Sequence, residues 1–116
     1  MDSAEFGLEA EAMAAQHLEV VRGWRLLASR VRFREGEIDL VMEQPNGLLA
    51  FVEVKARRSF TFGAAVESVT PQKVRRIRKA VAKWRVQSQD WREGELWLAA
   101  MELREGKMQI EMVPME

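Results

Sequence analysis

The sequence contains no cysteine and no long run of apolar residues. The absence of cysteine excludes a disulfide scaffold, a thiolate metal site and a cysteine nucleophile. No apolar stretch approaches the roughly 20 residues of a membrane-spanning helix, so we expect no membrane association. The acidic start, MDSAEFGLEAEA, also lacks the basic and then apolar segments of a signal peptide. These absences predict a cytoplasmic protein.

The composition predicts one folded domain over residues 1–116, because 47% of the residues are hydrophobic and 31% are charged. The formal net charge is zero, but the charges are unevenly distributed. Residues 1–19 hold five acids and no lysine or arginine, whereas residues 54–85 hold ten bases and one acid. Residues 90–116 are acidic again, with seven acids and three bases. This basic middle favours a polyanion as partner.

The spacing of apolar residues predicts the order αβββαββ, an α/β domain with a central mixed sheet flanked by helices. Gly23 is expected to end the first helix, and Thr70-Pro71 to open the second one with an N-cap and a proline at the first helical position. Residues 57–69, with Phe62-Gly63, read as a loop, and Glu105-Gly106 as the last turn. The expected helices cover residues 5–22 and 71–88, and the expected strands 24–34, 36–43, 48–56, 95–103 and 107–113.

The hairpin GEIDLVMEQPNGLLAFVEVK alternates charged and apolar residues on both strands. Pro45-Asn46-Gly47 fits a three-residue loop with glycine in the left-handed position. In that register Asp39 faces Glu53 and Glu37 faces Lys55. The apolar face then holds Ile38, Leu40 and Met42 opposite Val54, Val52 and Ala50. A loop of two or four residues would instead put Asp39 and Glu53 on opposite faces.

Two carboxylates on directly opposed positions repel one another, so a compensating cation is expected. Mg²⁺ is commonly held by one or two carboxylates together with water and phosphate oxygens. Asp39 and Glu53 are therefore candidate ligands of Mg²⁺ or Mn²⁺, and Lys55 would lie on the same face. Glu11 shares the packed face of the first helix with Ala14, Ala15 and Leu18, and a charge there needs a partner. These parts would suit metal-assisted phosphodiester hydrolysis.

A plainer interpretation of the hairpin also fits. An antiparallel hairpin with one solvated face shows the same alternation, and Glu37 with Lys55 would then be an ordinary cross-strand pair. The E-x-K spacing of Glu53 and Lys55 is weak evidence when taken alone.

The segments GEIDLV and FVEVKARRS, followed by Phe62-Gly63 and VTPQKVRRI, resemble the YraN family of small bacterial proteins. Gly7 and Glu11 on the first helix and Arg32 before the hairpin belong to the same ordered match, which covers roughly residues 7–85. The resemblance implies a restriction-endonuclease-like, PD-(D/E)XK fold related to archaeal Holliday-junction resolvases. It implies a nuclease triad of Asp39, Glu53 and Lys55, with Glu11 as the helix carboxylate.

The same resemblance implies a Mg²⁺- or Mn²⁺-dependent endonuclease acting on DNA, including branched DNA, and a homodimer. The sequence departs from the family at two places. The family usually has asparagine where this chain has Arg30, and an Arg-Phe-Asp segment where this chain has Glu95-Leu96-Trp97-Leu98.

The predicted nucleic-acid contacts lie beside the carboxylates and at the start of the second helix. As phosphate contacts they would give salt-dependent binding that does not depend on sequence. A solvated helix face is the alternative, as are a non-catalytic nucleic-acid-binding module and an adaptor for an acidic protein. The candidate residues are Arg32, Arg57, Arg58, Gln72, Lys73 and Arg76.

Overall fold

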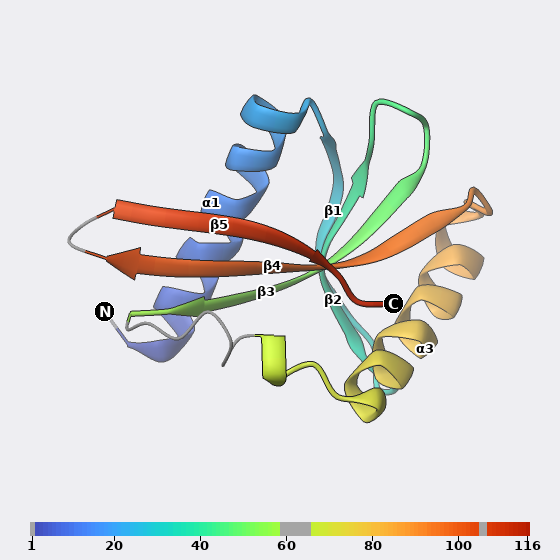
Figure 1. Cartoon of the computed structure of the whole chain (residues 1–116). Coiled ribbons are helices and arrows are strands. Elements are labelled where there is room, and N and C mark those ends of the chain that lie inside the picture. The colour runs from blue at the N-terminus through green and yellow to red at the C-terminus, as the bar shows by residue number, and fades with distance from the viewer. Residues whose placement is uncertain (1, 59–65, 105–106) are drawn as a thin grey trace.

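The computed structural model describes residues 2–58, 66–104 and 107–116, and its elements follow the predicted order (Figure 1). The predicted loop motif Phe62-Gly63 and the turn Glu105-Gly106 lie outside the described residues. In the part that is described, no helix is long and apolar enough to span a membrane. The elements are α1 (Ser3–Arg22), β1 (Arg25–Arg32), β2 (Glu37–Glu43), β3 (Leu49–Arg57), α3 (Pro71–Ser88), β4 (Gly94–Arg104) and β5 (Lys107–Pro114).

The five strands form one sheet in the order β1-β2-β3-β4-β5. β3 and β4 run parallel, and the other three neighbouring pairs are antiparallel, so the predicted mixed sheet is confirmed. A parallel pair needs a crossover connection, and α3 lies within the connection between β3 and β4. β3 is therefore the central strand, paired with its hairpin partner on one side and with the crossover strand on the other.

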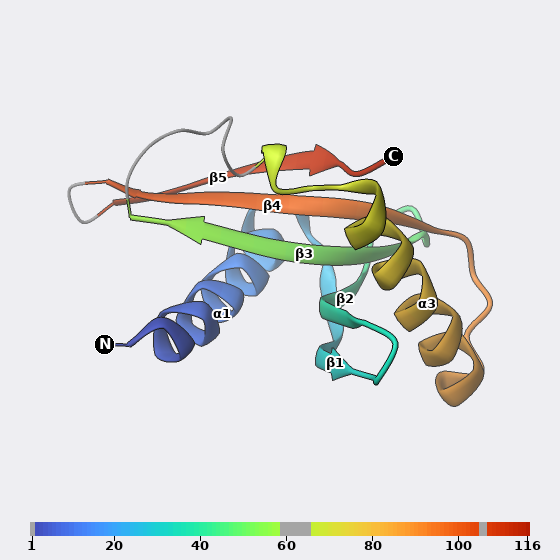
Figure 2. The ribbon, with the colours of Figure 1, turned by 90° about the horizontal axis from the view of Figure 1, so that it is seen from below.

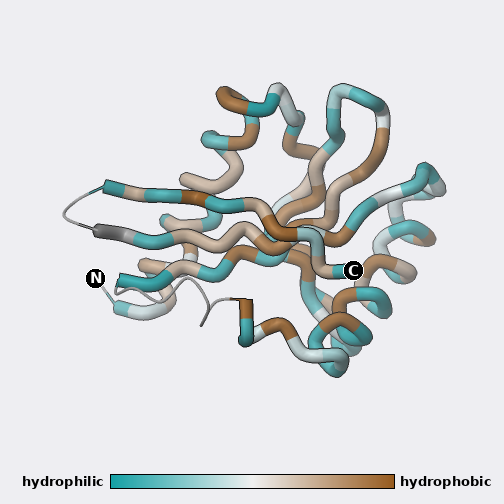
Figure 3. The backbone as a smooth tube through the Cα atoms, in the orientation of Figure 1, coloured by the Kyte–Doolittle hydropathy of each residue, from teal (hydrophilic) through white to brown (hydrophobic). Residues whose placement is uncertain are grey.

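The two helices cover different sides of the twisted sheet (Figure 2). On one side Ala14 and Leu18 of α1 pack with Leu40 and Val52 in a buried cluster. On the other side α3 contributes a second cluster, in which Ile77, Ala80 and Trp84 pack with Val41 and Phe51. Neighbouring strand residues point to opposite faces, which explains how Phe51 and Val52 join different clusters. The hydrophobic stretches accordingly follow the central parts of the strands (Figure 3).

The predicted end of α1 and the predicted start of α3 are confirmed by their capping geometry, whereas α1 begins at Ser3, two residues earlier than predicted. Gly23 ends α1 in the left-handed conformation, with φ 69°, which glycine adopts at little cost. The hydroxyl of Thr70 accepts a hydrogen bond from the backbone N–H of Lys73 at 3.1 Å, and Pro71 occupies the first position of α3. This cap fixes the first turn of α3, which carries Lys73.

The β2–β3 loop has the predicted three-residue form. The backbone N–H of Gln44 donates to the carbonyl of Leu48 at 2.8 Å, and Gly47 has φ 90°. The expected register holds from Glu43–Leu49 to Leu40–Val52. The register predicted from the turn residues is therefore confirmed for this half of the hairpin.

Beyond Leu40–Val52 the predicted register is wrong. The β2–β3 ladder ends there, so the described strands contain neither an Asp39–Glu53 nor a Glu37–Lys55 pair. Instead the N–H of Val54 donates to Oδ2 of Asp39 at 2.8 Å, and a side chain takes the place of a ladder carbonyl. Ile38 correspondingly packs in the α3-side cluster rather than beside Leu40.

The irregularity continues into β1. Its register against β2 shifts between Leu26 and Ala28, and Arg30 adopts a positive φ of 52°. Such bulges bend a strand and re-aim its side chains. The β1–β2 register is nevertheless regular on both sides of Asp39, with Ser29 opposite Leu40 and Val31 opposite Ile38.

Candidate active site

Asp39 is the buried centre of the candidate site, with 8% of the residue exposed. Its Oδ2 accepts the hydrogen bond from Val54, and its Oδ1 lies 3.6 Å from Nη1 of Arg32. The same Nη1 lies 3.6 Å from Oε2 of Glu37. Arg32, predicted to contact nucleic acid, therefore also bridges two carboxylates of β2.

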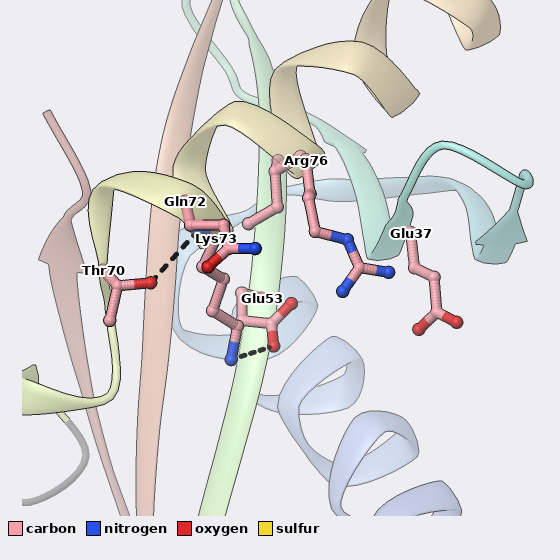
Figure 4. Close-up of a pocket in the computed structure, with 7 residues that line it drawn as sticks. Glu37, Glu53, Thr70, Gln72, Lys73 and Arg76 are labelled. Carbon is pink, nitrogen blue, oxygen red and sulfur yellow. Dashed lines mark hydrogen bonds and ion pairs between the residues drawn. The ribbon is translucent and has the colours of Figure 1, made fainter.

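Glu53 faces the first turn of α3. Nζ of Lys73 lies 3.0 Å from Oε1 of Glu53. A pocket of about 490 Å³ surrounds this ion pair (Figure 4). Gln72 and Arg76 reach it from α3, and Glu37 lines its far side. Three of the predicted nucleic-acid contacts, Gln72, Lys73 and Arg76, thus share one pocket with a predicted metal ligand.

Asp39 and Glu53 interact although they are not directly opposed. Burial raises the pKa of Glu53 above its usual value, and the negative charge of Asp39 raises that pKa further. Lys73 lowers the pKa through its hydrogen bond and its charge, and Lys55 lowers it through its charge, but burial and Asp39 outweigh them. The repulsion expected from the sequence is therefore present, by a different geometry.

Glu11 joins this cluster from α1. Its side chain is 14% exposed, and Nη1 of Arg30 lies 3.7 Å from its Oε1. That Oε1 is buried and finds no hydrogen-bond partner among the described residues. Burial raises the pKa of Glu11, Asp39 raises it further, and Arg30 and Arg32 pull it down. Arg30, missed as a site residue, supplies charge to Glu11.

Lys55 lies on the α1 side of the site. Burial lowers the pKa of Lys55, and the charges of Arg57 and Lys73 lower it further. Glu53 and Asp39 oppose this shift by favouring the ammonium form. Arg57 and Arg58 line the same surface depression as Lys55, between the start of α1 and the end of β3.

The structure thus brings Glu11, Asp39, Glu53 and Lys55 into one electrostatic cluster. It divides the predicted nucleic-acid contacts between two sides of that cluster. Gln72, Lys73 and Arg76 lie on the α3 side, and Arg57 and Arg58 lie on the α1 side. Glu37, predicted only as a cross-strand partner of Lys55, lines the α3-side pocket. Its position two residues before Asp39 on β2 is the sequence signal that could have identified it as a site residue.

The donor atoms of the cluster fit a hard divalent cation in an open site. The candidate ligands are the carboxylate oxygens of Asp39 and Glu53. Oε1 of Glu11, 3.7 Å from Nη1 of Arg30, accepts no hydrogen bond from the described residues. Among the described residues, no three histidine, cysteine, aspartate or glutamate side chains form a metal cage. Two carboxylates completed by water and phosphate are an arrangement that Mg²⁺ accepts. Asp39 and Glu53 are compatible with such two-carboxylate binding, and their role as metal ligands stays a prediction.

The basic helix α3 is partly neutralised within the chain. Lys73 pairs with Glu53, Lys83 with Glu35 at 2.7 Å, and Arg78 with Glu116. Arg75, Arg76 and Lys79 are exposed. The sequence overstated the free positive charge because these partners come from distant parts of the chain.

The fold and the site together define a small α/β protein with a partly buried carboxylate cluster, flanked by lysine and arginine. Residues 10–110 match the model of the uncharacterised protein family UPF0102. The chain belongs to this family, the YraN family predicted from its motifs.

Related proteins occur in several bacteria. A UPF0102 protein of Mycolicibacterium smegmatis is 46% identical over 82 residues, covering 70% of this chain and 65% of that protein. One of Corynebacterium efficiens is 41% identical over 92 residues, covering 79% and 73%. One of Deinococcus radiodurans is 42% identical over 78 residues, covering 67% and 63%. The chain therefore spans less than two thirds of the length of the first and third of these relatives.

Among solved structures, a similarity reaches Pyrococcus furiosus SfsA in complex with Ca²⁺. It covers 94% of this chain and 59% of that chain, at 12% identity and a TM-score of 0.31. A TM-score this low supports no conclusion about fold or function.

Proposed function

We propose that this protein is a Mg²⁺- or Mn²⁺-dependent endonuclease that binds DNA, including branched DNA, and hydrolyses phosphodiester bonds. The observation that carries the proposal is the convergence of three carboxylates from three elements, Glu11 on α1, the buried Asp39 on β2 and Glu53 on β3. Burial raises the pKa of both Glu11 and Glu53, and the negative charge of Asp39 raises both further. Perturbed carboxylates beside a lysine whose pKa is lowered are typical of catalytic sites.

Each residue of the site has a separate role in the proposed reaction. Asp39 and Glu53 would hold the cation, and Glu11 would support it from α1. A cation bound there would polarise the scissile phosphate and lower the pKa of a water. Lys55 would orient that water or offset developing negative charge. Gln72, Lys73 and Arg76 would hold phosphates on the α3 side, and Arg32 would contact a phosphate beside Asp39.

The arrangement of elements supports a restriction-endonuclease-like fold as part of the same proposal. The helix α1, the antiparallel strands β1 to β3, and the crossover through α3 to the parallel strand β4 occur in that order. In such a fold, Asp39 on β2 and Glu53 on β3 would supply the carboxylates of the nuclease. The homodimer stays a prediction, which light scattering of the purified protein can test.

Mn²⁺ binding by calorimetry tests the metal site, using Asp39→Asn and Glu53→Gln. Asparagine keeps an oxygen to accept the N–H of Val54, so the strand geometry is preserved while the charge is lost. We expect each change to weaken Mn²⁺ binding by roughly tenfold or more, the loss of a charged ligand being worth at least 1.4 kcal/mol. Cleavage of linear, nicked and four-way DNA would be lost in the same variants.

Glu9→Gln is the matched control. Glu9 is exposed on the same helix as Glu11, and the substitution removes one carboxylate charge, as the site variants do. It should leave Mn²⁺ binding and cleavage unchanged. Failure of the unmodified protein to bind Mn²⁺, both alone and with DNA present, would overturn the metal-dependent nuclease.

A non-catalytic DNA-binding module is the second candidate. It is favoured by the cations that already accompany the carboxylates, since Lys73 lies against Glu53 and Arg32 lies near Asp39. This module predicts DNA binding that weakens steeply with salt and is unaffected by Mn²⁺. Filter binding at several salt concentrations, with and without Mn²⁺, separates the two functions.

A further inference from the structure

A second groove opens on the α1 side of the carboxylate cluster, with a volume of about 670 Å³. We call it the α1–β3 groove. One wall is the N-terminal half of α1, with Phe6, Gly7, Ala10 and Glu11, and the other is residues 54–58 at the end of β3. Figure 2 shows the start of α1 beneath the arrowhead end of β3. The groove shares Glu11 and Lys55 with the candidate active site.

The groove forms where β3 extends beyond the end of its pairing with the antiparallel strand β2. Within the described chain, the β2–β3 ladder stops at Val52, while β3 continues to Arg57 along β4. The N–H of Val54 on this open side is taken by Asp39. Backbone groups two residues apart along a strand point the same way, so Ala56 turns its N–H and carbonyl toward the groove.

Gly7 keeps the opposite wall open. A Cβ placed on Gly7 would meet no atom within 4 Å, so the space beside it is unfilled. Phe6 is half-buried next to it, and the guanidinium of Arg58 lies 4.4 Å from the centre of the Phe6 ring. The groove thus offers an aromatic ring, a planar cation and free space at one place.

The charges and the aromatic group together select the ligand. Lys55 and Arg57 on β3 and Arg58 just after it outnumber the two acids of the groove, Asp2 and Glu11, and this excess of positive charge suits a backbone of phosphates. A positive groove with aromatic and arginine platforms is how proteins hold single-stranded nucleic acid, because unpaired bases expose their faces for stacking. The bases of an intact duplex are already stacked on one another and cannot use Phe6.

We propose that the α1–β3 groove binds a single-stranded segment of nucleic acid. Its phosphates lie along Lys55, Arg57 and Arg58, and a base stacks on Phe6 beside Arg58. This inference rests on the proposed function, since the groove begins at the residues assigned to hydrolysis. It names the substrate class as DNA with a single-stranded tail or branch rather than a blunt duplex.

Fluorescence anisotropy in EDTA tests the groove without any catalysis. The probes are a labelled thymidine oligonucleotide of about 12 residues, within the ~4–16 of single-strand sites, a same-length abasic oligonucleotide, a blunt duplex and a tailed duplex. The protein should bind the thymidine strand more tightly than the abasic strand of equal charge. It should also bind the tailed duplex more tightly than the blunt one.

Two variants address the groove directly. Phe6→Ala removes the ring and should weaken thymidine binding roughly tenfold, with little effect on the abasic strand. Gly7→Leu fills the open space and should weaken both single strands by at least that factor. Gly7→Ala is the matched control for the helix, and circular dichroism checks that each variant is folded. Arg76→Ala, on the α3 side, should instead weaken binding of the blunt duplex.

The outcomes separate this inference from the proposed function. Equal affinity for thymidine and abasic strands, or unchanged binding by Phe6→Ala and Gly7→Leu, would overturn the groove while leaving Mn²⁺-dependent cleavage standing. Loss of Mn²⁺ binding in Asp39→Asn with single-strand affinity retained in EDTA would support both. If the groove binds single strands but the protein binds no Mn²⁺, the single-strand site is supported and the metal-dependent nuclease is overturned.

Discussion

Nζ of Lys73 lies 3.0 Å from Oε1 of Glu53, so α3 supplies a positive charge to a carboxylate of the central strand. The Thr70 cap holds the backbone of Lys73 in the first helical turn. Burial and Asp39 both disfavour the ionised form of Glu53, and Lys73 is the nearest cation that favours it. The helix start therefore influences how Glu53 holds its proton.

We accordingly predict that Lys73→Met raises the pKa of Glu53. The variant removes the hydrogen bond and the charge that lower this pKa, while burial and Asp39 continue to raise it. A pH titration of the Glu53 side-chain carboxyl by NMR measures the change directly. Lys79→Met is the control, because Lys79 is an exposed lysine on the same helix. An unchanged Glu53 titration in Lys73→Met would show that the ion pair does not persist in solution.

Gly36→Ala should destabilise the protein strongly. Gly36 is buried where the β1–β2 turn meets α3, and a Cβ there would overlap the backbone carbonyl of Arg76. Backbone cannot rotate away as a side chain can, so the strand turn and the helix must separate. We expect a loss of roughly 3 kcal/mol, the upper end of the usual overpacking range, in the free energy of unfolding by urea.

Gly7→Ala gives the opposite result in the same experiment. Gly7 is helical, and its Cβ would meet open space. Alanine costs less backbone entropy on folding than glycine, so stability should rise by about 0.5–1 kcal/mol. A Gly36→Ala variant that is no less stable than the unmodified protein would mean that the close approach at Gly36 is not retained in solution.

Arg30→Asn should stabilise the protein. Arg30 has φ 52°, a left-handed conformation that is costly for most side chains and that asparagine adopts more readily. The ion pair with Glu11 is lost, but it is long, at 3.7 Å, and the Arg30 side chain is 48% exposed. We expect a net gain of roughly 0.5 kcal/mol in urea unfolding. Arg30→Lys, which keeps both charge and strain, should show no gain.

The family that the sequence resembles usually has asparagine at this position. The left-handed backbone of residue 30 is a physical reason for that preference. A clear loss of stability in Arg30→Asn would mean that the charge beside Glu11 outweighs the backbone strain.

Glu11→Gln should make stability less dependent on pH. The pKa of Glu11 is raised in the folded protein above its usual 4.5, so between these two values the folded state binds more protons than the unfolded state. Stability contributed by this group is therefore present below pH 4.5 and is lost as the pH rises through the folded pKa. The variant should be the more stable protein at pH 7.

Thermal unfolding at pH 7 and at pH 4 checks this sign. The difference in Tm between Glu11→Gln and the unmodified protein should be positive at pH 7 and should shrink at pH 4. Glu9→Gln provides the control on the exposed side of α1. A Tm of Glu11→Gln below that of the unmodified protein at pH 7 would contradict the raised pKa.

The end of α1, the start of α3 and the β2–β3 turn could be predicted because each depends on a few neighbouring residues. Gly23, Thr70 and Pro71 mark helix ends through their own backbone preferences, and Gly47 marks the turn that sets half of the hairpin register. Glu11 was placed correctly on the inward face of α1 because helical spacing decides it. Each of these features is encoded within a few residues.

The remaining parts of the site depend on exceptions to those local rules. Arg30 in a left-handed conformation carries no glycine signal, so the irregular β1 and the end of the β2–β3 ladder could not be read from the sequence. The contact between Lys73 and Glu53 depends on how α3 docks on the sheet. Phe6 and Arg58 lie at the ends of different elements, and only the fold brings them together.

The position of β3 between a hairpin partner and a crossover partner also bears on the order of folding. Leu49 is close in sequence to Glu43 but pairs on its other side with Gly94. Contacts between near residues form faster than contacts that close a long loop. We therefore expect the hairpin that links Asp39 to Val54 to form early, and the Lys73–Glu53 contact to form only when the crossover closes. The two halves of the site would then be assembled at different times, and the site would be among the last features of the molecule to form.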